Sequence, residues 1–265
     1  MPTPLDQLLS EGCAVVAIGP GGAAALSTLY NEATEFFRAD EAMKLRFGVP
    51  DRTNGYRPFG YAHAGDPENP DLNDSFLYWK HRRNIPNCTE ITPFLDALEN
   101  YRAIAAGITT AIIRDLSEHY GYQRALPFET ASHLQLNSFG TPARRELLQT
   151  RHEDAVLMTV IWTSAPGLEC EVDGVMHPVH FAPDEVRVMA GSIMTVMTEG
   201  EIQPCYHLAR NTGNADRKSV MYFVNPDVDR PVMPFTGNDA GTGIRDIVMG
   251  NPNSHFGLSD DFVSP

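Results

Sequence analysis

The second half of the chain consists of short apolar segments separated by turn residues, and this spacing constrains the fold more than any other feature. Segments with β-branched or alternating apolar residues occur at 133–137, 155–162, 169–172, 186–189, 192–197 and 220–224. Glycine or proline marks expected turns at 165–167, 173–174 and 199–200. Short strands at such spacing are typical of a sandwich or a jelly roll. We therefore expect a mainly β fold with flanking helices, in which a jelly roll forms the core.

The first half of the chain has helical periodicity instead. Residues 93–120 carry an apolar stripe at helical spacing, and Gly121 ends it. Thr92 precedes a proline and is expected to be the N-cap. Residues 23–46 show the same spacing, and the glycine-rich run 19–22 before them is expected to be a turn. These two segments predict helices that support the sheet from outside.

Length and composition favour a single domain. A chain of 265 residues can bury one substantial core, and its apolar fraction of 42% is ordinary for a globular protein. We expect residues 1–130 to supply helical support and lid-like loops, and residues 131–235 to form the jelly-roll core. The stretch 48–90 is rich in turn residues and in aromatic residues, which favours an ordered lid or pocket wall.

Two histidines and an aspartate have the pattern of a metal site. His152 and Asp154 are two positions apart, so in an extended strand their side chains share one face while Glu153 points away. His207 lies far along the chain and must return beside them on another strand. Two imidazoles and one carboxylate, with open positions left on the metal, are the ligand set of non-haem Fe(II). We predict an Fe(II) site at these three residues.

Arg217 and Ser219 follow the last histidine of this set and suggest an acidic ligand. The guanidinium fork matches a carboxylate, and a hydroxyl adds a further donor. Taken singly, each of these residues has an ordinary structural explanation, such as a surface arginine. The joint pattern of order, spacing and strand character predicts that a metal and an acidic co-substrate bind together.

The net charge and the cysteines limit the partners and the cell compartment that we expect for this protein. The net charge of −14 argues against nucleic acid and against an anionic membrane surface, and the basic run 80–83 is interpreted as solvated surface. The four cysteines contain no C-x-x-C pair, so we expect free thiols and no zinc–thiolate site. Residues 1–10 lack the basic start of a signal peptide, and no apolar run approaches the roughly 18 residues of a membrane span. A cytoplasmic protein is expected.

Short motifs accompany the metal residues in a fixed order. They are His152-x-Asp154, Gly167-Leu168, Met189-Ala190-Gly191-Ser192, Thr198-Glu199-Gly200, His207, Arg217-x-Ser219 and Phe223-x-x-Pro226. With them, nearly the whole chain resembles the Fe(II)- and 2-oxoglutarate-dependent oxygenases of the isopenicillin N synthase-like superfamily. The resemblance implies a double-stranded β-helix core, Fe(II), O2, and 2-oxoglutarate held by Arg217 and Ser219. It also implies hydroxylation or desaturation of a small molecule, coupled to decarboxylation of 2-oxoglutarate to succinate.

The chain departs from this family at one position. Members often carry Asn-x-Tyr on the strand leading to the metal, whereas this chain has Asn137-Ser138-Phe139. Phe139 cannot donate a hydrogen bond, so the co-substrate is expected to depend more on Arg217 and Ser219. Asn137 is a further candidate contact for the co-substrate, and an ordinary strand amide is an equally good explanation of it.

The substrate and the exact reaction stay open. Arg57 is a candidate for holding a substrate carboxylate, with Tyr56 and Phe139 beside it, and an amino acid or a specialised metabolite would suit such a site. One alternative is an oxidative cyclase of the same superfamily that does not use 2-oxoglutarate. Another is a non-catalytic jelly-roll binding protein, because a fold does not fix a function. The oligomeric state is not determined by the sequence, and a monomer is compatible with it.

Overall fold

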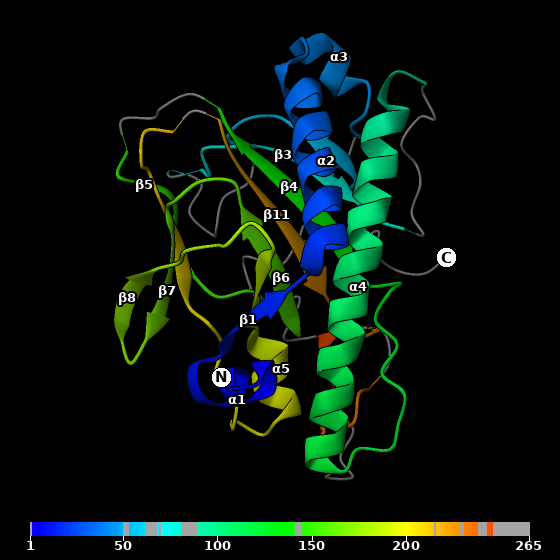
Figure 1. The fold of residues 1–265 in the computed structure, drawn as a ribbon, viewed down its shortest axis with the longest axis vertical. Coiled ribbons are helices and arrows are strands. Elements are labelled where there is room, and N and C mark those ends of the chain that lie inside the picture. Colours follow the sequence, from blue (N-terminus) through cyan, green and yellow to red (C-terminus); the bar gives the residue numbers. More distant parts are fainter. Residues whose placement is uncertain are drawn as a thin grey trace.

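The protein is built from two antiparallel sheets that face each other, with helices on the outer side of the longer one (Figure 1). The computed structural model describes residues 2–49, 53–61, 68, 70–80, 89–140, 145–214, 216–227, 231–237 and 243–245. The long sheet has the order β1 (Cys13–Ala17), β9 (Glu185–Ala190), β6 (Met158–Thr163), β11 (Arg217–Val224), β4 (His133–Phe139), β3 (Asp74–Tyr78) and β2 (Gly55–Arg57). The short sheet has the order β5 (Leu147–His152), β10 (His207–Arg210), β7 (Leu168–Val172) and β8 (Val175–Pro178).

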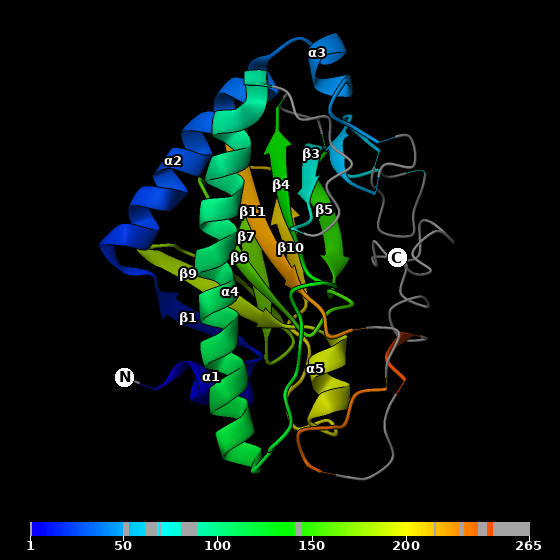
Figure 2. The same ribbon diagram turned by 90° about the vertical axis from the view of Figure 1, so that its right-hand side faces the viewer.

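Helices cover the outer face of the long sheet, as Figure 2 shows. The long helices α2 (Gly19–Arg38) and α4 (Thr92–Tyr120) cross that face, while α3 (Glu41–Leu45) lies at one end of the molecule and α1 (Pro4–Glu11) and α5 (Ser192–Met197) lie at the other. A short 3-10 turn spans Thr89–Ile91. The helices α2 and α4 pack side by side, and Phe36 of α2 stacks on Phe94 of α4 with ring centroids 4.8 Å apart. Phe36 also meets Phe76 of β3 edge to face at 5.2 Å, which joins both helices to the sheet.

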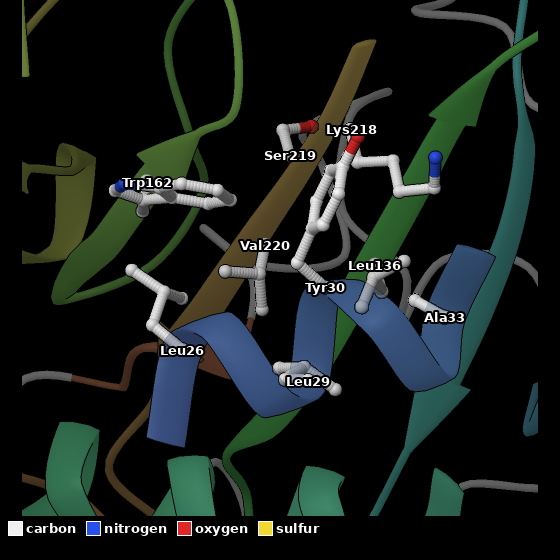
Figure 3. A pocket seen from close by; sticks show the side chains of 9 residues that line it. All are labelled: Leu26, Leu29, Tyr30, Ala33, Leu136, Trp162, Lys218, Ser219 and Val220. Carbon is white, nitrogen blue, oxygen red and sulfur yellow. The ribbon is translucent and has the colours of Figure 1, made fainter. Parts of the chain in front are cut away.

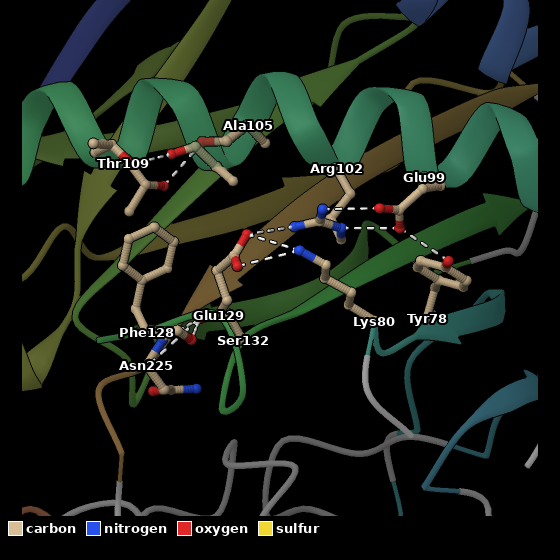
Figure 4. A network of polar contacts seen from close by, with 12 residues as sticks. Tyr78, Lys80, Glu99, Arg102, Ala105, Thr109, Phe128, Glu129, Ser132 and Asn225 are labelled. Carbon is tan, nitrogen blue, oxygen red and sulfur yellow. Dashed lines mark hydrogen bonds and ion pairs between the residues drawn. The ribbon is translucent and has the colours of Figure 1, made fainter. Parts of the chain in front are cut away.

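An ion-pair network around the buried Arg102 fastens α4 to the sheet as well (Figure 4). Arg102 of α4 donates to Glu99 at 2.9 and 3.0 Å and to Glu129 at 3.2 Å. Tyr78 of β3 donates to Glu99 at 3.0 Å, and Lys80 donates to Glu129 at 3.2 Å. Because the Arg102 side chain is only 5% exposed, these carboxylates supply the counter-charge that its burial requires.

Three local predictions were wrong. The run 19–22 is the first turn of α2, where Pro20 is tolerated because helix-start N–H groups lack partners anyway. Thr92 is the first residue of α4 rather than its cap, and Ile91 occupies the cap position without a side-chain hydrogen bond. Residues 192–197 form the helix α5 instead of a strand. Short apolar runs do not reveal their period, so helix and strand are easily confused there.

The loop-rich stretch 48–90 contains more regular structure than expected. Its strands β2 and β3 extend the long sheet at one edge. Trp79 stacks on His133 with centroids 4.2 Å apart and donates to the Thr53 carbonyl at 2.9 Å, so this part is an ordered wall. The remainder of the predicted lid, at 62–67 and 81–88, lies outside the described residues.

None of the helices in the described part of the chain combines the length and the hydrophobicity needed to span a membrane. The predicted strands at 133–137, 169–172, 186–189 and 220–224 are all found, each with a shift of a few residues at most. Strand formation there follows from alternating or β-branched apolar residues, which pack well on a pleated surface.

Candidate active site

The fold brings His152, Asp154 and His207 together at one end of the space between the two sheets. His152 ends β5 and His207 begins β10, and the two residues are direct partners across these neighbouring strands. Their Nε2 atoms lie 3.9 and 3.8 Å from Oδ1 of Asp154. The three side chains are 8–13% exposed, so the site is nearly closed to solvent.

Asp154 reaches this position by a route that the period-two argument did not foresee. The strand β5 ends at His152, and Asp154 lies in the connection to β6. The Ser192 amide donates to the Asp154 carbonyl at 3.1 Å and fixes that connection against the start of α5. Gly191 is required there, because a Cβ atom on it would lie 2.2 Å from the Val156 oxygen and 2.6 Å from the Asp154 oxygen.

Hydrogen bonds orient both imidazoles. Nδ1 of His152 lies 2.6 Å from the Thr150 carbonyl oxygen, and Nδ1 of His207 lies 3.1 Å from the Cys205 carbonyl oxygen. A carbonyl accepts only, so each Nδ1 carries the proton and each Nε2 presents its lone pair to the centre. Burial, followed by the neighbouring His152, lowers the pKa of His207, which favours the neutral form that ligates a metal.

Thr159 is a functional residue that the sequence analysis missed. Its hydroxyl donates to Oδ2 of Asp154 at 2.6 Å, which leaves Oδ1 as the oxygen facing the two histidines. Thr159 and Thr163 share the inner face of β6, since alternate residues of a strand point to the same side. The signal available in the sequence was this pair of threonines at even spacing in an otherwise apolar strand.

A row of polar side chains crosses the inner face of the long sheet. The register pairs Arg57 with Ser75, Ser75 with Asn137, Asn137 with Ser219, and Ser219 with Thr163. Directly paired residues in antiparallel strands point to the same face, so all five face the short sheet. The residues between them on the same strands point to the opposite face, toward the helices, as Figure 3 shows for Lys218 and Val220 beside α2. The cavity on that side measures about 10 Å³ and has no room for a substrate.

Arg217 lies at the end of the same inner face and is 2% exposed. Its Nε and Nη1 atoms have no hydrogen-bond partner among the described residues. Its guanidinium stacks on the Phe139 ring, 4.4 Å from the centroid. Burial lowers the pKa of Arg217 to about 10, so the group remains a cation at neutral pH. A buried cation without an anion is costly, and an acidic ligand would remove that cost.

Asn137 offers a second donor in the same row. Its Oδ1 accepts from Gln135 Nε2 at 2.9 Å, which fixes the amide orientation. Its Nδ2 is buried and lacks a hydrogen-bond partner within the described structure. Ser219 is the direct strand neighbour of Asn137. Arg217, Ser219 and Asn137 therefore lie on one face of neighbouring strands, and their role in binding an acidic co-substrate stays a prediction.

The three substrate candidates have different outcomes. Phe139 lies on the inner face, stacked on Arg217, where it shapes the anion pocket. Arg57 is 1% exposed on the same face, and its guanidinium carbon lies 5.6 Å from the centroid of the Tyr61 ring. These contacts do not test a substrate role, so that role stays a prediction. Tyr56 was a wrong choice: its hydroxyl donates to Asp74 at 3.1 Å and its ring meets Phe36. Neighbours on a strand point to opposite faces, so Tyr56 and Arg57 cannot both line the site.

The residues present fit a first-row divalent metal and a dicarboxylate. Metal–ligand bonds of about 2.1 Å place adjacent ligand atoms about 3 Å apart, so the three donors need only a small contraction. Their ligand atoms all lie within 4.8 Å of one another. The unpaired donors of Arg217 and Asn137 provide the charge and hydrogen bonds that a carboxylate needs.

The chain is similar in sequence to known enzymes. The flavonoid 7-O-demethylase 1 of Ocimum basilicum is 26% identical over 231 residues, which cover 80% of this chain and 60% of the demethylase. Gibberellin 2-beta-dioxygenase 3 of Arabidopsis thaliana is 24% identical over 234 residues, which cover 80% of this chain and 68% of that enzyme. This chain thus spans about two thirds, or slightly less, of the length of these relatives.

A solved structure of a full-length Neurospora crassa protein in complex with alpha-KG superposes with a TM-score of 0.76. It is 17% identical, and the match covers 93% of this chain and 87% of that one, which confirms the predicted jelly-roll fold. The model of the 2OG-Fe(II) oxygenase superfamily matches residues 131–226, the segment that carries the three candidate ligands, Arg217 and Ser219. The resemblance predicted from the sequence is confirmed: residues 131–226 of this chain are similar to the 2OG-Fe(II) oxygenase superfamily.

Proposed function

We propose that this protein is an Fe(II)- and 2-oxoglutarate-dependent dioxygenase that hydroxylates or desaturates a small organic molecule. The buried guanidinium of Arg217 is the observation that carries the proposal. It faces the same interior as the His152, Asp154 and His207 side chains, yet two of its nitrogens lack partners in the described residues. A cation in that position is useful to the protein only if an acidic ligand enters.

The metal ligands would be Nε2 of His152, Nε2 of His207 and Oδ1 of Asp154. Bound Fe(II), with 2-oxoglutarate and O2, supplies the oxidising power to break a substrate C–H bond. The chain holds the three donors on one side, so positions opposite them stay open. The Thr150 and Cys205 carbonyls fix the imidazole tautomers, and Thr159 holds the second oxygen of Asp154. These contacts orient the ligands before any metal arrives.

Arg217, Ser219 and Asn137 would hold the carboxylate of 2-oxoglutarate that lies far from the metal. Along β6, Thr159 at the metal end and Thr163 beside Ser219 are four residues apart, which corresponds to about 13 Å of extended strand. A five-carbon diacid and an extended arginine side chain can cover this span together. The Phe139 ring shields the guanidinium face from water and so strengthens the ion pair.

The substrate is proposed to be a small molecule, and the relatives support this class. They are named for a flavonoid and for gibberellin, which are both small organic compounds. Arg57 on the inner face supports a substrate that carries a carboxylate, such as an amino acid or a specialised metabolite. Direct stabilisation of one carboxylate by a buried arginine would select such compounds from neutral ones.

Anaerobic titration tests the proposal. We expect 2-oxoglutarate to bind the Fe(II) protein with a charge-transfer absorbance, and Arg217→Met to lose it. Lys218→Met is the matched control, since Lys218 is the next residue and points to α2. Succinate release from 2-oxoglutarate during turnover with a carboxylate-bearing substrate panel provides the second readout. A wild-type protein that binds iron but shows no 2-oxoglutarate absorbance contradicts the proposal and favours the cyclase alternative.

We also propose a cytoplasmic location. The free thiols of Cys13, Cys170 and Cys205 support it, because thiols this close together are kept reduced most readily in that compartment. Cell fractionation with antibody detection tests the location, and recovery in an oxidising compartment would contradict it.

A further inference from the structure

The fold collects three cysteines that the sequence places far apart. Cys13 begins β1 at the edge of the long sheet, and Cys170 lies in β7 of the short sheet (Figure 1). Cys205 lies two residues before β10, in the connection that leads into that strand. Their three sulfur atoms all lie within 4.8 Å of one another. The sequence predicted free thiols without a zinc–thiolate site, and the tertiary structure places three of them at one point.

Backbone hydrogen bonds fix two of these cysteines against each other. The Ala190 amide donates to the Gly12 carbonyl at 2.8 Å, and the Cys205 amide donates to the Ala190 carbonyl at 2.9 Å. Gly12 permits this approach, because a Cβ atom there would lie 2.5 Å from the Gln203 carbonyl oxygen. Cys170 is the direct strand partner of His207, so its side chain shares the inner face of the short sheet. Two of the three cysteines therefore lie in strands of the two sheets, and a backbone hydrogen bond to β9 holds the third.

The surroundings are dry and rich in sulfur. The cysteines are 2–9% exposed and lie among apolar side chains, with Val156, Ile161, Leu168, Met189, Met221 and Phe223 in the same cluster. The thioether of Met189 lies 3.8 Å from the Cys170 sulfur. Three sulfurs at about 2.3 Å from a central ion are about 4 Å apart, so a small contraction would complete a three-coordinate site.

We propose that Cys13, Cys170 and Cys205 form a second metal site, separate from the iron site, that binds one Cu(I) ion. Thiolate and thioether ligands select soft ions. Structural Zn²⁺ almost always takes four ligands, and the fourth sulfur beside this cluster is a thioether, which suits Cu(I) better. Binding forms Cu–S bonds and releases protons from the thiols that become thiolates, with no change in oxidation state.

Arg187 provides a counter-charge for the thiolates. It lies on β9 two residues before Met189, so both side chains occupy the face that carries Cys13. The guanidinium interacts electrostatically with Cys13 and Cys170. One arm donates to the His180 carbonyl at 3.0 Å, while its buried Nε has no partner among the residues described. A negative thiolate site in an apolar core needs such a neighbour.

Anaerobic Cu(I) titration of the Fe(II)-loaded protein, against a chromophoric Cu(I) chelator, tests the site. We expect one tightly bound Cu(I) per chain, and sulfur-only coordination near 2.3 Å in X-ray absorption of the wild-type protein. Loss of an outer contact of a metal ligand typically lowers metal affinity about 10–100-fold, and loss of a direct ligand should lower it further. Cys13→Ala and Cys170→Ala should therefore each weaken Cu(I) binding by at least about 100-fold. Cys88→Ala is the matched control and should bind Cu(I) like wild type.

Two further measurements separate this site from the iron site and from misfolding. His152→Ala, which removes an iron ligand, should keep the bound Cu(I). Circular dichroism checks that each cysteine variant is folded, and the wild-type X-ray absorption does not depend on any variant. Nitrogen in the copper shell, equal binding by the triple cysteine variant, or a disulfide between two of the three cysteines in protein purified without oxygen would each overturn the proposal.

Discussion

The hydrogen bond from Thr159 to Asp154 should control the affinity for Fe(II). At 2.6 Å it lies in the short range of hydroxyl–carboxylate bonds, and the Asp154 side chain is only 11% exposed. Thr159→Val keeps the shape of the side chain and removes the donor, so water cannot readily replace the lost bond.

The size of the effect follows from the charge of the acceptor. A hydrogen bond to a charged group contributes about 1.5–3 kcal/mol, which corresponds to roughly 10–150-fold in a binding constant. Outer contacts of metal ligands typically change affinity about 10–100-fold. We expect the dissociation constant for Fe(II) to rise by about 10–100-fold in Thr159→Val.

Anaerobic Fe(II) titration followed by tryptophan fluorescence, with Mn(II) as an oxygen-stable check, measures this change. Thr163→Val is the matched control: it removes a hydroxyl from the same face of β6, but that hydroxyl donates to the Ala165 carbonyl at 2.9 Å. The control should bind metal like wild type. A folded Thr159→Val protein whose Fe(II) affinity changes less than threefold would refute the role given to this hydrogen bond.

Further predictions concern the donors around Arg217, the connection that carries Asp154, and the support of α4. Arg217→Met should abolish 2-oxoglutarate binding without loss of thermal stability, because it removes a buried cation that lacks partners in the described chain; a lower melting temperature of the apo variant would contradict this. The charge of Arg217 should also set the pH dependence of binding. The affinity for 2-oxoglutarate, measured by isothermal titration calorimetry, should stay constant above neutral pH and fall once the pH exceeds the Arg217 pKa of about 10. Since that pKa lies below the ordinary value of an arginine, the unfolded chain binds more protons than the folded chain above pH 10, so the contribution of Arg217 to folding stability should rise there with pH. Gly191→Ala should destabilise the fold by about 1–3 kcal/mol in urea and weaken Fe(II) binding, because its Cβ collides with the carbonyls of Val156 and Asp154; wild-type behaviour in both assays would refute this steric argument. Glu99→Gln combined with Glu129→Gln should lower the unfolding free energy by about 3 kcal/mol in urea, since Arg102 stays buried as a cation, and a loss below about 1 kcal/mol would show that solvent replaces the network.

The local pattern of the chain was sufficient to find the strands and the long helix. Alternating apolar residues at 133–137 and a short continuous apolar run at 220–224 predict β4 and β11, because both patterns depend only on neighbouring residues. The same reasoning failed at 192–197, where a single helical turn and a short buried strand have the same apolar composition. It also missed β2 and β3, whose partners lie far along the chain.

The residues of the candidate site likewise include some that the sequence alone revealed and others that it did not. His152, Asp154, His207 and Arg217 stood out because their chemical types and order are unusual together. Thr159 did not, since a threonine in a strand has no distinctive chemistry until its partner is known. Tyr56 was chosen for its aromatic ring beside Arg57, and the pleat of β2 places it on the opposite face.

The sequence by itself determined the donor types, the strand character of the second half, and the acidic ligand implied by Arg217. Only the tertiary structure decided which donors meet. The pairing of His152 with His207 and the gathering of Cys13, Cys170 and Cys205 join segments distant in the chain. The contact of Thr159 with Asp154 spans only five residues, but it depends on how the connection between β5 and β6 is folded. Such contacts depend on the register between strands and on the closure of the connections between them, and a shift of one residue would turn every side chain to the other face.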